Sequence, residues 1–469
     1  MSKIKSLLLG SAAAVVAATG AQAADLPIIA AEPVDYVRVC DVYGRGFFYI
    51  PGTETCLKID GYVRVEATVH DNSVAADRWT GEPFFVTDEA NNFNTTSFRA
   101  RGQVRFDART ETEWGLLRSY IALEGTATDT DPGAAIVEKA FVQFAGFTAG
   151  LAPSILNFDD VGEFGDQVGN WNDDMLQFAY TAEFGAGFSA TIGVEGMNDI
   201  NSGDQLEGDG LFPVFFIEDE VGFSTDGSGI GSFLYDTEGD SDVRDELPAL
   251  LANMRIEQAW GSAMIGGVVK DNNARIFNGF PDEENSEDRI GYAVVGGLAI
   301  NLPMIAEDDQ FILRAAYGRG ANTYVTGLED DYAEVGFSGD VSTVGGLGVI
   351  IDSLDDVSLE NNEAWSVYGG FSHFFTERLR TNIAASYANI DYDDIGGSFD
   401  GVGFSGGDVS ALTASGNVIF SPVAGLDLGL ELYYSALEID GGDDFVLAPI
   451  DADDEADGFG GIFRVQRSF

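Results

Sequence analysis

Apolar and polar residues alternate with a period of two along many stretches of this chain. In residues 57–70, LKIDGYVRVEATVH, the odd positions from Leu57 to Val69 are apolar or glycine, and the even positions from Lys58 to His70 are polar or tyrosine. A two-residue period predicts a β-strand with one apolar and one polar face. The stretch is longer than the five or six residues of a typical strand in a globular protein.

The same pattern predicts sixteen strands, an even number. They are expected near residues 57–70, 95–110, 114–126, 136–145, 147–152, 174–183, 187–196, 251–258, 260–270, 288–301, 309–319, 363–374, 379–392, 408–420, 425–438 and 457–469. The links between them alternate in length: short links precede long, acidic ones, of which 197–250 and 320–362 are the largest. This rhythm predicts an all-β fold, a 16-stranded antiparallel transmembrane β-barrel with short periplasmic turns and long extracellular loops. A soluble β-sandwich is the alternative.

The N-terminus has the features of an export signal. Residues 1–23 contain Lys3 and Lys5, then an apolar run, then the sequence Ala21-Gln22-Ala23. This order predicts a signal peptide over 1–23, a periplasmic-side segment over 24–56 and the barrel over 57–469. Together with the strand pattern, export predicts a multi-pass barrel in the outer membrane of a Gram-negative cell.

Only two cysteines are present, Cys40 and Cys56. In an oxidising compartment such a close pair favours a disulfide over a metal site, and the chain has only two histidines, far apart, to complete a zinc site.

The balance of charge is strongly acidic, with 24 basic residues, 78 acidic residues and a net charge of −54. Such a chain repels nucleic acid, which we therefore exclude as a partner. Four of the scarce arginines nevertheless occur on one face of the strand 95–110, at Arg99, Arg101, Arg105 and Arg109. Because the other face is apolar and would meet lipid, the arginines are expected to face a watery lumen.

We expect Arg64, Arg99, Arg101 and Arg105 to form a basic wall in this lumen. The link 151–174 contains acidic and aromatic residues and no basic residue. If this third loop folds inward, its acidic side chains face the basic wall, and the field between them selects solutes by charge. The acidic side chains proposed for this constriction are Asp159, Asp160, Glu163 and Asp166. The alternative is a solvated surface loop.

Residues 34–64, the ending GGIFRVQRSF and the segment AWGSAMIGGVV at 259–269 resemble the alphaproteobacterial general porin family. The resemblance covers the two ends and scattered strands. It implies a sixteen-stranded barrel, a homotrimer, an inward third loop and passive diffusion of small hydrophilic solutes. It also implies that Phe469 is the C-terminal aromatic residue read by the barrel assembly machinery.

No motif indicates an enzyme: GxSxG with triad partners, HExxH and the Walker loop are all missing from the sequence. The expected mechanism is a cation-preferring pore without catalysis or cofactor. The acidic loops could hold Ca²⁺ or Mg²⁺ or contact lipopolysaccharide and outer-membrane lipid. A substrate-specific channel, which saturable flux would reveal, and a loop-mediated adhesin on the same barrel are the alternative functions.

Overall fold

In the computed structural model, the described residues form two compact units, one before and one after the boundary between Cys56 and Leu57. The described residues are 38–70, 75–77, 82–84, 96–128, 133, 135–165, 167–196, 248–277, 284–327, 335–338, 341–343, 349–351, 358–391, 396–399, 402–405, 407–441 and 453–469. The expected signal peptide 1–23, most of the link 197–250 and Asp166 lie outside them. The two units are treated separately below.

The first unit is a small disulfide-linked fold. A disulfide joins Cys40 to Cys56, as predicted, with 6.0 Å between their Cα atoms. The unit contains the 3-10 helix η1 (Asp41–Tyr43) and the short strand β1 (Phe48–Tyr49). Both cysteines are buried beside Phe47, so the bridge and one aromatic ring form its core.

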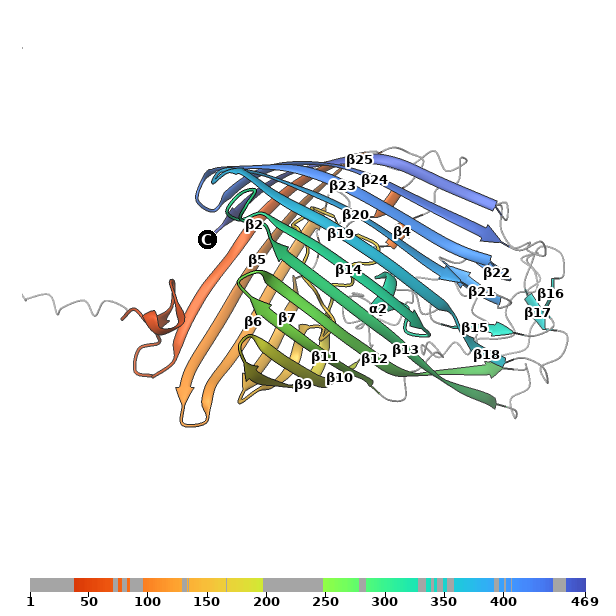
Figure 1. Cartoon of the computed structure of the whole chain (residues 1–469), viewed down its shortest axis with the longest axis horizontal. Coiled ribbons are helices and arrows are strands. Elements are labelled where there is room, and N and C mark those ends of the chain that lie inside the picture. The colour runs from red at the N-terminus through yellow and green to blue at the C-terminus, as the bar shows by residue number, and fades with distance from the viewer. Residues whose placement is uncertain are drawn as a thin grey trace, which may run out of the picture. The chain divides into compact units, whose positions relative to one another are not determined.

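The second unit is a closed antiparallel barrel whose sixteen strands match all sixteen predicted ones (Figure 1). They are β2 (Cys56–His70), β5 (Thr96–Thr112), β6 (Gly115–Thr128), β7 (Ala135–Phe144), β8 (Phe147–Pro153), β9 (Asp174–Gly185), β10 (Phe188–Gly196), β11 (Ala249–Gln258), β12 (Gly261–Phe277), β13 (Glu284–Asn301), β14 (Gln310–Arg319), β19 (Glu363–Thr376), β20 (Leu379–Asp391), β23 (Gly407–Val423), β24 (Leu426–Gly441) and β25 (Asp453–Ser468).

Each strand pairs with the next, and β25 returns to pair with β2, in a register that runs from Tyr62 opposite Ser468 to His70 opposite Gly460. The last residue joins this seam, because the Phe469 amide donates to the Gly61 carbonyl at 3.0 Å and the Gly61 amide donates back at 3.2 Å. Closure leaves no open sheet edge, which is what a strand protein needs to satisfy its backbone in lipid.

The two faces of each strand differ as the alternation predicts. On β5, Phe98 and Val104 are exposed on the outer face, whereas Arg99, Gln103 and Asp107 are buried on the inner face. Large apolar side chains are exposed on the outer face around the barrel, among them Val63, Ile121, Phe178, Ile192, Ile265, Val294, Ile383 and Leu430. The outer surface is therefore apolar and the interior polar, the arrangement of a transmembrane barrel.

The long links contain further structure that the sequence pattern did not predict. Small sheets pair β3 (Ala75–Asp77) with β4 (Glu82–Phe84) and β16 (Val341–Thr343) with β17 (Val349–Ile351), and a third combines β15 (Val335–Ser338), β18 (Ser358–Asn361), β21 (Gly396–Phe399) and β22 (Val402–Ser405). The single-turn helix α2 (Thr323–Thr326) packs against β13, β14, β19 and β20. Among the described residues, no helix is long and apolar enough to cross a membrane.

Candidate functional site

The link between β8 and β9 folds into the barrel and follows its inner wall. Side chains of the wall bind its backbone: Asn253 of β11 donates to the Ile155 carbonyl at 2.6 Å, and Ser372 of β19 donates to the Val161 carbonyl at 3.1 Å. Further along, Asn382 of β20 and Asn417 of β23 both donate to the Gly162 carbonyl at 3.1 Å. Residues 154–173, called the inward loop below, are thus held by strands far apart in the sequence.

Strand glycines receive the apolar side chains of the inward loop. A Cβ atom at Gly297 would lie 2.5 Å from the Phe158 ring, and one at Gly429 would lie 2.2 Å from the Phe164 ring. A Cβ atom added at Gly193 would lie 2.8 Å from the Ile155 side chain. One at Gly266 would lie 2.5 Å from Leu156, and one at Gly370 would lie 2.6 Å from Val161. Only a residue without a side chain leaves room at these five positions, which we call the glycine sockets.

A buried carboxylate fixes the start of the inward loop. Glu195 of β10 is fully buried; its two oxygens accept hydrogen bonds from the Ile155 amide at 2.6 Å and the Ser154 hydroxyl at 2.9 Å. The Tyr324 hydroxyl lies 3.4 Å from the same carboxylate. Glu195 therefore ties the loop to both the wall and α2.

The segment around α2 forms a second layer that supports the inward loop. The fully buried Arg314 of β14 donates to the carbonyls of Gly169 in the loop and of Tyr324 in α2, the latter at 2.7 Å. The Gly169 amide donates to the Thr326 carbonyl at 2.5 Å, and the Trp171 and Tyr324 rings lie 5.1 Å apart. Part of the predicted link 320–362 thus lies inside the barrel, behind the third loop.

Arg99 of the predicted basic wall shares a carboxylate with an arginine of the last strand. Glu66 of β2, fully buried, accepts from Arg99 at 2.8 Å and from Arg464 of β25 at 2.5 Å. Arg464 also donates to the Phe164 carbonyl at 2.7 Å and lies 3.9 Å above the Phe164 ring. The loop is therefore fastened beside the barrel seam by a cation–π contact and a charged hydrogen bond.

The other residues of the basic wall also contact partners on the barrel strands. Arg101 pairs with Glu124 of β6 at 3.0 Å, and Arg105 pairs with Asp60 of β2. Arg64 donates to the Gln466 side chain at 2.8 Å. All four predicted arginines thus lie on β2 and β5, the strands that follow β25 around the barrel.

The structure places three of the four predicted loop carboxylates. Asp159 and Asp160 are exposed, and Asp159 pairs at 3.2 Å with Arg255 of β11, a partner that the sequence analysis did not single out. Glu163 accepts from the Tyr368 hydroxyl at 2.8 Å, while its other oxygen is buried without a hydrogen-bond partner among the described residues. Burial, with the nearby Asp160 charge, raises the pKa of Glu163 to about 7.

Several residues that hold the loop were missed by the sequence analysis, notably Glu66, Glu195, Arg314 and Arg464. Each is a charged residue on the polar face of a predicted strand, a signal that identifies a lumen-facing position but not its partner. Within the described ranges, no cluster of three or more His, Cys, Asp or Glu side chains could hold a metal ion.

A closed barrel with an apolar outside, a polar inside and a loop fastened along its inner wall defines an outer-membrane channel protein. Comparison with known proteins agrees: residues 25–455 match the model of the porin subfamily. The chain is 30% identical to porin Omp2b of Brucella suis, over 99% of this chain and all of that protein. It is 33% identical to porin Omp2b of Brucella canis, over 69% of this chain and 87% of that one.

The chain therefore belongs to the porin subfamily and lies in the outer membrane of a Gram-negative cell. Among solved structures, the outer membrane channel DcaP of Acinetobacter baumannii has a similar fold, with a TM-score of 0.58 and 17% identity, over 90% of this chain and 99% of that one.

Proposed function

We propose that this porin forms a passive, water-filled diffusion pore for small hydrophilic solutes and ions, narrowed between the inward loop and the basic wall. The observation that carries the proposal is the fastening of the loop inside the barrel, from Glu195 on β10 to Arg464 on β25. A loop bound at so many points keeps its position and sets the size of the solutes that pass.

Charge at this constriction supports a preference for cations. Glu66, Glu124 and Asp60 offset the charge of Arg99, Arg101 and Arg105. On the loop, Asp159 and Asp160 remain exposed. The wall carboxylates reduce the positive charge of the arginines, although Glu66 is shared with Arg464 and Arg64 meets only the neutral Gln466 amide. The exposed acids of the loop add negative potential on the opposite side, which attracts cations and repels anions.

The test is the single-channel conductance and reversal potential of the purified protein in a planar bilayer under a potassium chloride gradient. We expect ohmic, cation-selective steps, and the variant with Asp159→Asn and Asp160→Asn should have a several-fold lower cation-to-anion permeability ratio. Glu113→Gln, a carboxylate in the turn between β5 and β6, is the matched control and should leave the ratio unchanged. A folded barrel that conducts no ions would refute the pore.

Selectivity should also depend on pH near neutrality. Since burial and the Asp160 charge raise the pKa of Glu163 to about 7, this side chain gains a proton as the pH falls through that value. The loop then loses a negative charge, and the cation preference should decrease between about pH 8 and pH 6. Reversal potentials across this range should shift in the wild type and remain flat in Glu163→Gln. Identical pH profiles for the two proteins would rule out Glu163 as the titrating group.

The same proposal includes the assembly of the protein. We propose that residues 1–23 are removed on export and that the barrel assembly machinery recognises Phe469. The finished barrel then associates into a homotrimer in contact with lipid and lipopolysaccharide. Phe469 is exposed at the end of β25, where a second protein can reach it.

A further inference from the structure

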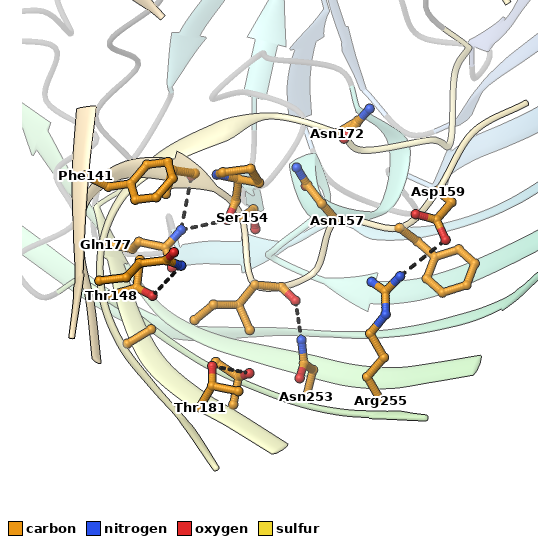
Figure 2. A pocket seen from close by; sticks show the side chains of 17 residues that line it. Phe141, Thr148, Ser154, Asn157, Asp159, Asn172, Gln177, Thr181, Asn253 and Arg255 are labelled. Carbon is orange, nitrogen blue, oxygen red and sulfur yellow. Dashed lines mark hydrogen bonds and ion pairs between the residues drawn. The ribbon is translucent and has the colours of Figure 1, made fainter. Parts of the chain in front are cut away.

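A pocket lies between the first half of the inward loop and the inner faces of β7 to β11 (Figure 2). It has a volume of about 440 Å³. Its walls are the strands on one side and the loop segment from Ser154 to Asp159, with Asn172, on the other. The volume is in the range of small-molecule sites, at the size of one or two sugar rings.

The charges at this pocket are already paired. Arg255 is the only basic residue of the lining; it lies 3.2 Å from Asp159 and 2.8 Å from Glu257. An anion entering the pocket would meet a guanidinium group that two carboxylates already neutralise. A cation would have to share Asp159 with Arg255. Because removing an ion from water is costly without a free partner, the pocket disfavours both kinds of charged solute.

The rest of the polar lining consists of uncharged hydroxyl and amide groups. The Thr181 and Thr191 hydroxyls share one hydrogen bond of 3.0 Å, so one proton of the pair stays available to a ligand. The Thr148 hydroxyl accepts from the Gln143 amide at 3.2 Å and keeps its own proton for donation. The three threonines line the pocket from β8, β9 and β10, and Figure 2 shows Thr148 and Thr181 beside it. The Gln177 and Asn253 side chains also line it, with their amide nitrogens donating to backbone carbonyls.

We infer that this pocket is a binding site for a neutral, polyhydroxylated solute the size of a mono- or disaccharide. Such a solute carries many hydroxyl groups and no charge, so it exchanges hydrogen bonds with water for hydrogen bonds with the hydroxyl and amide lining. This inference rests on the proposed pore, because the site lies along its lumen and would retain one class of solute during passage.

The experiment measures the reduction of open-channel current by glucose and by trehalose in the planar bilayer. Glucosamine and gluconate serve as cationic and anionic comparisons of the same size. In the wild type, both neutral sugars should reduce the current in a saturable manner. The charged analogues should require at least about ten-fold higher concentrations for the same reduction of current, because no free partner in the pocket offsets the cost of removing their charge from water.

The variant with Thr181→Val and Thr191→Val keeps the shape of the pocket and removes two hydroxyls. It should raise the half-blocking sugar concentration about ten-fold with unchanged open-channel conductance, and Thr148→Val should act in the same direction. The control is Thr68→Val on β2, a buried threonine that does not line the pocket. Its half-blocking sugar concentration should equal that of the wild type.

The possible results test the proposed sugar site and the proposed pore separately. Normal conductance without saturable sugar block, or block that the threonine variants leave unchanged, overturns the pocket and leaves the pore intact. Block by the charged analogues at the same concentrations overturns the assignment of a neutral solute. A lack of conductance before any sugar is added overturns the proposed pore, and the pocket's role in passage with it.

Discussion

Replacing Glu66 with alanine is expected to lower the free energy of unfolding of the barrel by about 3 kcal/mol. Glu66 is fully buried, and Arg99 and Arg464 share its carboxylate. Removing one partner of a buried ion pair typically costs about 3–5 kcal/mol because the remaining charge loses its compensation. We take the lower end, since both guanidinium groups keep a small exposure to the lumen, 7% for Arg99 and 11% for Arg464.

The measurement is the urea concentration at which the barrel loses its compact, heat-modifiable migration on gels. Glu257→Ala is the matched control: Glu257 also pairs with an arginine, but its side chain is 66% exposed. An exposed pair contributes about 1 kcal/mol or less, so this variant should unfold near the wild-type midpoint. Equal midpoints for Glu66→Ala and Glu257→Ala would show that the shared carboxylate does not stabilise the seam.

The second large effect is expected from Gly297→Ala in β13. The new Cβ would lie 2.5 Å from the face of the Phe158 ring, so the ring and the loop segment that carries it must move away from the wall. Overpacking of this kind costs about 1–3 kcal/mol. Because the loop can move only toward the lumen, single-channel conductance should fall as well as stability.

The chain provides a control for this variant in the preceding residue. Gly296 lies on the outer face of the same strand, where an added Cβ would meet its nearest atom, the Ala315 carbonyl oxygen, at 4.0 Å. Gly296→Ala should therefore leave both conductance and the unfolding midpoint unchanged. If Gly297→Ala behaves in the same way, Phe158 is not seated as the structure shows.

The strands could be predicted from sequence because a two-residue period is a local property. Each residue of 57–70 reveals its face by comparison with its immediate neighbours, whereas the period is weakest in 147–152 and 251–258. The small sheets of the long links could not be found in this way, since strands of three or four residues such as β16 are too short to show a period.

The contacts of the inward loop could not be predicted from the local sequence pattern, because they join residues far apart in the chain. The aromatic residues of the link 151–174 are visible in the sequence, and Phe158 and Trp171 are both buried. Their partners are remote in sequence: Arg464 lies 300 residues from Phe164, whose carbonyl it binds. A signal for the sockets was present in the paired glycines of VVGGLAI and VYGGF, where Gly297 and Gly370 interrupt otherwise bulky strands.

The fastening of the loop by the last two strands has a consequence for how the protein matures. Phe164 depends on Glu431 of β24, which accepts its amide at 2.6 Å, and on Arg464 of β25, so its binding site does not exist until those strands are in place. Contacts between such distant parts of a chain have a large loop-closure entropy to overcome and are slow to form. We therefore expect an unfinished barrel to hold its inward loop only partly, with the contacts of Phe164 forming when β25 pairs with β2.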